Sequence, residues 1–227
     1  MKEKLAELIR KTSGEKVLLE HEVKGFLKEM GLSVPRGVFL KDECDISRAK
    51  ILKKPLIAKT ATRLFASKSD IGGIRGDIKN LSELRRAFKE LMRIRGAEGV
   101  LVEELAAGRL EVIIGGITDP QFGPVVMFGL GGFFVEVMRD VVFALAPLAR
   151  EDALALINRI KGINLLTGIR GKPPADLEEI ARAVSIVSEI ISTGLVEEID
   201  INPLMVFSKG AIVLDSKMSL KEEKRES

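Results

Sequence analysis

Acidic and amide side chains stand at the ends of two strand-like segments near the C-terminus. Asp200 and Asn202 alternate along an apolar stretch, so they face the same side of a strand. Asp215 follows the next apolar stretch, and the short turn 208–210 between the two predicts antiparallel neighbours whose side chains converge. Carboxylate and amide oxygens are the ligands that Mg²⁺ prefers in proteins. The pattern indicates a magnesium site, but acids at strand ends are often only solvated, and both interpretations stay open here.

A glycine-rich stretch, residues 124–148, could bind phosphate. Gly129, Gly131 and Gly132 follow an apolar run, and the alternating run after them carries Glu136. Successive backbone N–H groups in such a turn can form a concave nest for an anion. A tight glycine-rich hairpin between two core strands explains the same spacing. The stretch matches neither GxGxxG nor GxxxxGK(S/T), so it is not a standard Rossmann or P-loop fingerprint.

Lys59 ends the apolar segment PLIAKT, residues 55–60, which predicts a strand. A lysine in this position is usually only solvated, but it is also the kind of point charge that holds a nucleotide phosphate. The lysine, the glycine nest and the oxygen donors near the C-terminus together suggest a nucleotide–Mg²⁺ site. His21, the single histidine, lies on an expected helix with no metal-binding neighbour, and we assign it no role.

Hydrophobic periodicity predicts both helices and strands, and the period of two with hairpin-length links predicts an antiparallel sheet in the middle of the chain. The 3.6-residue period predicts helices near the N-terminus and at 15–30, 46–52, 80–92, 150–160 and 176–193. Alternation and short links predict strands at 37–40, 55–60, 99–105, from 111, 125–128, 133–138, 195–201 and 211–214. The polar, glycine-punctuated stretch 61–76 reads as a loop.

Composition limits the function classes. Of 227 residues, 36 are basic and 33 acidic, so the net charge of +3 predicts no nucleic-acid partner. No run is long and apolar enough to span a membrane, and the N-terminus reads as a charged amphipathic helix. The single cysteine, Cys44, cannot form an internal disulfide, so we expect a reducing cytoplasm. A single glutamine and the absence of Trp and Tyr hint at a thermophile.

Several blocks carry a resemblance to a known family. They are PLIAK, KSDIGGI, GVLVEEL, TDPQFGPVVMFGLGGFFVEVMRDVVF and EIDINPL with LDSK, and the match around them runs over about residues 15–220. They resemble the β subunit of ADP-forming acyl-CoA synthetases, a family similar to succinyl-CoA synthetase β. The resemblance implies an ATP-grasp fold, two α+β lobes that clasp a nucleotide, divided here into 1–103 and 104–227. It implies ADP or ATP and Mg²⁺ as cofactors. It also implies a separate α subunit with the CoA site and a phosphohistidine.

The resemblance also implies roles for individual residues. Lys59 would contact the nucleotide phosphates, and Glu111 would accept hydrogen bonds from the sugar hydroxyls. The adenine-facing hinge would be formed, mainly through backbone groups, by Glu103, Glu104 and Leu105. Mg²⁺ would be bound by Asn202, Asp215 and Asp200. The incoming phosphohistidine loop or phosphate would meet Gly129, Gly131, Gly132 and Glu136.

Three positions depart from the family pattern. Ser67 stands where the family carries a phosphorylated histidine, and Ala144 stands where it has an arginine. The hinge is also one residue shorter before Glu111. These losses favour a catalytically lapsed paralogue that only binds nucleotide or scaffolds a partner, whereas the intact phosphate and metal residues oppose it. The apolar residues Phe133, Phe134 and Phe143 are expected to help dock the α subunit.

Overall fold

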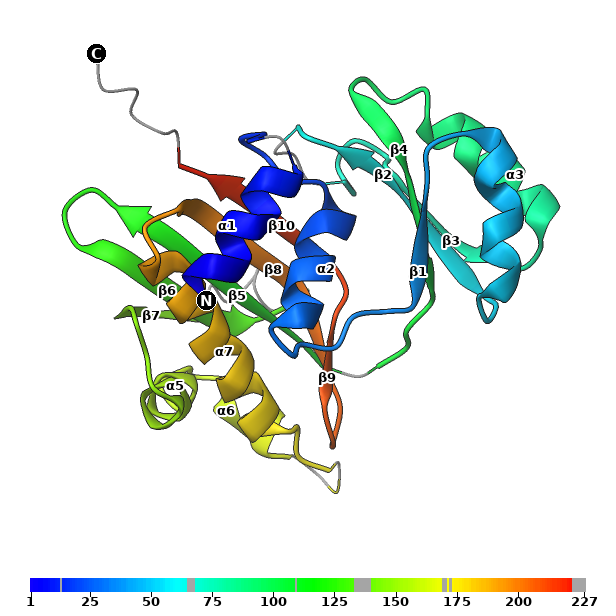
Figure 1. The fold of residues 1–227 in the computed structure, drawn as a ribbon. Coiled ribbons are helices and arrows are strands. Elements are labelled where there is room, and N and C mark those ends of the chain that lie inside the picture. The colour runs from blue at the N-terminus through cyan, green and yellow to red at the C-terminus, as the bar shows by residue number, and fades with distance from the viewer. Residues whose placement is uncertain are drawn as a thin grey trace, which may run out of the picture. The chain divides into compact units, whose positions relative to one another are not determined.

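The structure is a computed structural model that describes residues 1–12, 14–64, 68–108, 110–132, 140–168, 171 and 173–221 (Figure 1). Its internal contacts divide the chain into two compact units. The larger unit consists of Met1–Leu18, Glu22–Val34 and Gly108–Ser227, and the smaller one of Leu19–His21 and Pro35–Ala107. Each unit has its own sheet and its own hydrophobic core.

The larger unit is built on a six-stranded antiparallel sheet with the order β10-β8-β5-β6-β7, and β9 pairs with β8. Its strands are β5 (Leu110–Asp119), β6 (Gly123–Leu130), β7 (Val141–Leu145), β8 (Val196–Val206), β9 (Ala211–Val213) and β10 (Ser216–Leu220). The hairpin links and alternating apolar residues predicted this antiparallel pairing, which is confirmed.

Helices cover one face of this sheet. They are α1 (Lys2–Lys11), α2 (Glu20–Glu29, its first residues counted with the smaller unit), α5 (Arg150–Ile157), α6 (Ile163–Thr167) and α7 (Leu177–Ser192). α7 packs against β5, β6 and β8 (Figure 1). It begins where the side chain of Asp176 accepts a hydrogen bond from the N–H of Glu179. The predicted apolar spacing of α7 is confirmed, because Ile180, Val184 and Val187 are fully buried.

The other face of the sheet carries the polar candidates. Ile199 and Ile201 belong to the core under the helices. Because side chains alternate along a strand, Asp200 between them points to the opposite face. Cross-strand partners share a face, so Gly115 and Lys217, which pair with Asp200, lie there too.

The smaller unit is a four-stranded antiparallel sheet with the order β1-β4-β2-β3. Its elements are β1 (Gly37–Leu40), a 3₁₀ helix η1 (Glu43–Ile51), β2 (Leu56–Thr62), β3 (Ile74–Ile78), α3 (Leu81–Leu91) and β4 (Ala97–Glu104). The Asn80 side chain caps α3 by accepting a hydrogen bond from the N–H of Glu83. The carboxylate of Glu83 accepts in turn from the N–H of Lys79, 2.7 Å away.

Several features differ from the sequence expectations, and one expectation is not tested. β3 begins inside the stretch that was expected to be a loop. The strand was missed because two of its residues are exposed and leave little apolar alternation. α6, β7 and β10 were not predicted. The units do not coincide with the expected halves 1–103 and 104–227, because Leu5, Val23 and Leu27 of the N-terminal helices are buried in the core of the larger unit. The strand expected at 133–138 lies outside the described residues.

Among the residues that the structure describes, no helix is long and apolar enough to cross a membrane.

Candidate functional site

The open face of the larger sheet brings the three expected metal ligands together. Asp200 and Asn202 lie on β8, and Asp215 directly precedes β10. The backbone N–H of Asn202 donates to the carbonyl oxygen of Asp215 at 3.1 Å. Lys217 is the cross-strand partner of Asp200. The predicted convergence of these groups from neighbouring antiparallel segments is therefore present.

Asp200 is the electrostatically unusual group of this cluster. Burial raises the pKa of its carboxyl group to about 6. The carboxylates of Asp215 and Glu198 also raise this pKa, whereas the ammonium group of Lys217 and a hydrogen bond with the Asn202 side chain lower it. Two carboxyl groups that repel one another in a partly desolvated place form a site that a cation would stabilise.

The donor chemistry of this cluster fits Mg²⁺. Two carboxylates and one amide oxygen are hard oxygen donors of the kind that Mg²⁺ accepts alongside nucleotide phosphates. Within the described part of the chain, no group of three or more His, Cys, Asp or Glu side chains is arranged to hold a metal ion. A complete cage of protein ligands is therefore missing from the described residues, and phosphate oxygens would have to supply further ligands.

The glycine-rich stretch packs against Glu111. The N–H of Gly131 donates to the carbonyl oxygen of Glu111 at 2.6 Å. A Cβ atom on Gly131 would lie 2.8–2.9 Å from main-chain and side-chain atoms of Glu111, so this position needs glycine. Gly132 has a positive φ of 63°, and a Cβ there would lie 3.1 Å from a carboxylate oxygen of Glu111. The structure thus places the predicted phosphate glycines beside the predicted ribose acid.

The tight hairpin was one of two interpretations of this stretch, and its second strand, 133–138, lies outside the described residues. Gly129 lies within β6 and pairs with Ile113 and Val141 on either side. β6 and β7 are antiparallel neighbours, but residues 131–140 separate them. Asp140 ends this connection, and its carboxylate accepts the N–H groups of Lys161 and Gly162 at 2.9 and 2.7 Å. Glu136 lies outside the described residues.

The smaller unit holds the expected hinge and the phosphate lysine. The N–H of Glu104 donates to the carbonyl oxygen of Arg36, and that of Leu105 to the carbonyl oxygen of Pro55. Internal hydrogen bonds therefore engage both hinge N–H groups. The side chain of Glu103 is 2% exposed and does not face solvent.

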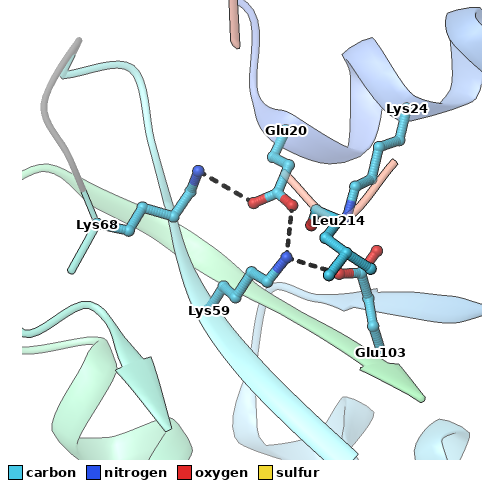
Figure 2. A network of polar contacts seen from close by, with 6 residues as sticks. All are labelled: Glu20, Lys24, Lys59, Lys68, Glu103 and Leu214. Carbon is cyan, nitrogen blue, oxygen red and sulfur yellow. Dashed lines mark hydrogen bonds and ion pairs between the residues drawn. The ribbon is translucent and has the colours of Figure 1, made fainter. Parts of the chain in front are cut away.

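Lys59 lies inside β2 and is buried, so the expectation of a lysine at a strand end is wrong. Figure 2 shows its ammonium group between two carboxylates, Glu20 Oε1 and Glu103 Oε2, each 2.9 Å away. The other oxygen of Glu20 pairs with the ammonium nitrogen of Lys68 at 3.1 Å. We call these four residues, Glu20, Lys59, Lys68 and Glu103, the lysine–glutamate cluster.

Sequence reasoning missed Glu20, Lys68 and Lys24. Lys24 lies one turn after Glu20 on α2, and its ammonium group donates to the carbonyl oxygen of Leu214, next to Asp215, at 2.8 Å. A signal was available, because Glu20 and Lys24 lie at i and i+4 on the helix face that also carries the buried Leu27. Charged side chains on the apolar, core-facing side of a helix indicate that they pair with buried groups of opposite charge or with buried carbonyl groups. The ring of His21, to which the sequence assigned no role, stacks on Phe39.

Known proteins resemble this chain over nearly its whole length. Residues 10–220 match the ATP-grasp domain family. The β subunit of acetate–CoA ligase (ADP-forming) I from Pyrococcus furiosus is 38% identical over 96% of this chain and 98% of its own length. Acetate–CoA ligase (ADP-forming) II of Archaeoglobus fulgidus is 38% identical over 92% of this chain. This chain spans only 31% of that longer relative.

Solved structures agree with these relatives. Acetyl-coenzyme A synthetase 1 of Ca. Korarchaeum cryptofilum, in complex with coenzyme A and Ca-AMPCP, is 37% identical and superposes with a TM-score of 0.87. That alignment covers 96% of this chain and 99% of the other. A second complex of the enzyme, with coenzyme A and Mg-AMPPCP, gives a TM-score of 0.79 at 38% identity over 94% of this chain and 97% of the other. There the phosphohistidine segment points towards the nucleotide binding site. The present chain therefore belongs to the ATP-grasp family, together with the β subunits of ADP-forming acetate–CoA ligases.

Proposed function

We propose that this chain is the nucleotide-binding subunit of an ADP-forming acyl-CoA ligase. The overall reaction is acyl-CoA + ADP + Pi ⇌ acid + CoA + ATP. The observation that carries the proposal is the match to a β subunit over 98% of that subunit's length. The glycines beside Glu111 and the oxygen donors on the same sheet face support it.

The residues of the chain bind and position the nucleotide. Glu111 accepts hydrogen bonds from the sugar hydroxyls, and Lys59 contacts the phosphates. Glu103, Glu104 and Leu105 face the adenine. The stretch Gly129–Gly132, with Glu136, meets the phosphoryl donor. Phosphoryl transfer depends mainly on such positioning and on charge neutralisation, so the chain needs no nucleophile of its own.

Asp200, Asn202 and Asp215 are the proposed ligands of Mg²⁺. When bound, the ion neutralises charge on the phosphates. The raised pKa of Asp200 and its nearness to Asp215 support this assignment, because a cation relieves the repulsion between the two carboxyl groups. Lys217, the cross-strand partner of Asp200, limits the negative charge of this cluster.

A separate α subunit supplies the CoA site and a phosphohistidine. Two observations support this partner. The relative that this chain covers almost completely is a β subunit, and a longer single-chain relative has about two thirds of its own sequence outside the match, since the match covers 31% of it. In addition, the phosphohistidine segment of the Ca. Korarchaeum cryptofilum enzyme points towards the nucleotide binding site.

The test is to express the chain with and without its α subunit and to measure ATP formed from acetyl-CoA, ADP and phosphate. We expect ATP only when both subunits are present. ADP binding without turnover in the assembled complex would contradict a catalytic role. That result would instead support the lapsed, nucleotide-binding subunit that Ser67 and Ala144 suggest.

A further inference from the structure

The lysine–glutamate cluster is buried and joins charges of opposite sign. The side chains of Glu20 and Glu103 are 2% exposed, and those of Lys59 and Lys68 are 6% exposed. Two carboxylates therefore face two ammonium groups, and all four residues belong to the smaller unit. Buried charges are costly unless they are paired. The position of each charged group in this cluster is consequently set by the others.

Glu20 is the member that joins the two lysines. Its Oε1 accepts from Lys59 at 2.9 Å, and its Oε2 lies 3.1 Å from the ammonium nitrogen of Lys68 (Figure 2). One carboxylate thus holds two ammonium groups side by side, one on each oxygen. Glu103 contacts Lys59 from its other side at 2.9 Å.

The main chain brings Lys68 to this place. The N–H of Gly73 donates to the carbonyl oxygen of Lys68 at 2.6 Å, and the N–H of Thr60 donates to the carbonyl oxygen of Gly73 at 2.8 Å. A Cβ on Gly73 would lie 2.7 Å from the Thr60 side chain and 3.0 Å from the Lys68 carbonyl oxygen. Glycine at 73 therefore lets the segment approach β2 closely, next to Lys59.

We propose that Lys68 is a second cation for the nucleotide phosphates and that Glu20 is the positioning residue that holds Lys59 and Lys68 as a pair. This inference rests on the proposed function and extends it to two residues without an assigned role. A lysine ammonium is a point charge on a flexible stem, so it contributes to a phosphate site only when another group fixes its place. Two such groups on neighbouring oxygens of one carboxylate are spaced for the neighbouring oxygens of a phosphate.

A purely structural ion-pair network is the competing explanation. Such a network would hold β2, Glu20 and the 68–73 segment together without regard to the ligand. The two explanations differ in what they predict for ligands with and without phosphate. Loss of a phosphate-binding pair weakens the binding of ADP and leaves the binding of adenosine unchanged. Loss of a structural network weakens the binding of both ligands equally, or of neither.

The experiment is calorimetric titration of the full chain with ADP and with adenosine, for Lys68→Gln, Glu20→Gln and the double variant. Lys79→Gln, an exposed lysine of the same unit, and Glu29→Gln, an exposed glutamate on α2, are matched controls. We expect Lys68→Gln and Glu20→Gln each to lower the affinity for ADP about tenfold or more, with the affinity for adenosine unchanged within about twofold. Because Glu20 acts through the lysines, the double variant should lose less than the sum of the two single losses.

Thermal melting of each variant separates a folding defect from a binding defect. Lys68→Gln removes one charge from the cluster and retains a hydrogen-bonding side chain, so it tests the inference even if Glu20→Gln unfolds. Parent-like ADP affinity in Lys68→Gln, an equal loss of adenosine, or tighter ADP binding in a folded Glu20→Gln would overturn the inference and leave the proposed function standing. A parent chain that binds no adenine nucleotide would overturn both.

Discussion

The backbone N–H of Asn202 donates to the carbonyl oxygen of Asp215 at 3.1 Å, although thirteen positions of sequence numbering separate the two residues. The chain between them turns through β9 and returns, so the proposed metal ligands are joined by the sheet itself. A change in either side chain therefore leaves the main-chain frame in place. Substitutions here should report on charge and coordination more than on folding.

The carboxyl group of Asp200 should make the metal-free chain less stable as the pH rises. Its folded-state pKa of about 6 exceeds the ordinary value of 3.8, so the folded chain binds the proton more tightly than the unfolded chain. The free energy of unfolding should consequently fall between about pH 4 and pH 6, by no more than about 2–3 kcal/mol. Asp200→Asn should remove this fall, which urea unfolding at several pH values measures.

Asp176 provides a control of opposite sign. A hydrogen bond from the N–H of Gly210 lowers the pKa of its carboxyl group. Its contribution to stability is therefore present above the unfolded-state pKa and is lost as the pH falls through the folded-state pKa. Asp176→Asn should cost stability at neutral pH and less in acid. Equal pH profiles for Asp200→Asn and the parent would show that Asp200 titrates normally.

Gly131→Ala should destabilise the chain by about 1–3 kcal/mol, because the new Cβ meets the main chain of Glu111, which cannot move aside cheaply. Gly25→Ala is the matched control. A Cβ on Gly25 in α2 meets nothing within 4 Å, and alanine favours helices, so stability should rise by about 0.5–1 kcal/mol. Thermal unfolding measures both. Parent-like stability of Gly131→Ala would mean that the glycine stretch does not pack tightly against β5.

The edge strand β7 is the proposed docking surface for the α subunit. Phe143 and Leu145 on this strand are 53% and 61% exposed, which leaves apolar surface for a partner to cover. Phe133 and Phe134, which the sequence also suggested, lie outside the described residues. Leu145→Lys should weaken assembly with the α subunit and leave ADP affinity unchanged.

Co-purification and gel filtration measure this assembly. Ile51→Lys is the control, since Ile51 is 60% exposed but belongs to the smaller unit. Normal assembly of Leu145→Lys, or an equal defect in the control, would place the interface elsewhere.

Ser67 should carry no phosphate during turnover. A serine phosphate is a stable ester and a poor donor to ADP compared with a phosphohistidine, so we expect direct transfer from the partner's histidine. The complex is loaded with radiolabelled phosphate, and its subunits are separated in mild base. Label should appear on the α subunit and be discharged by ADP. Label on this chain that ADP discharges would contradict direct transfer, and loss of activity in Ser67→Ala would indicate a covalent role.

The sequence predicted the sheets better than the buried charges. Alternating apolar residues in β5, β6 and β8 have one dominant cause, burial of one face, so their pairing could be read from local pattern. The burial of Lys59 could not, because its partner Glu20 lies 39 positions away in the sequence. Lys68 was assigned to a polar loop for the same reason. Charged residues are rarely buried unless they are paired, and the sequence did not show that Glu20 is the partner of Lys68.

Binding of ADP with and without Mg²⁺ tests the account most directly. The proposed site predicts that the parent chain binds ADP more tightly when Mg²⁺ is present. Asp215→Asn neutralises one proposed ligand, so it should lose most of this gain and keep the metal-free affinity within about twofold. Asp152→Asn, an exposed acid at the start of α5, should behave as the parent.

Calorimetric titration of these three proteins with ADP, each in the presence of Mg²⁺ and of EDTA, tests whether Asp215 belongs to the metal site. We expect a Mg²⁺-dependent gain in ADP affinity for the parent and for Asp152→Asn, and little or no gain for Asp215→Asn. An equal gain in all three proteins would remove Asp215 from the metal site. A parent chain that binds no ADP in either condition would contradict the central claim that this chain is the nucleotide-binding subunit.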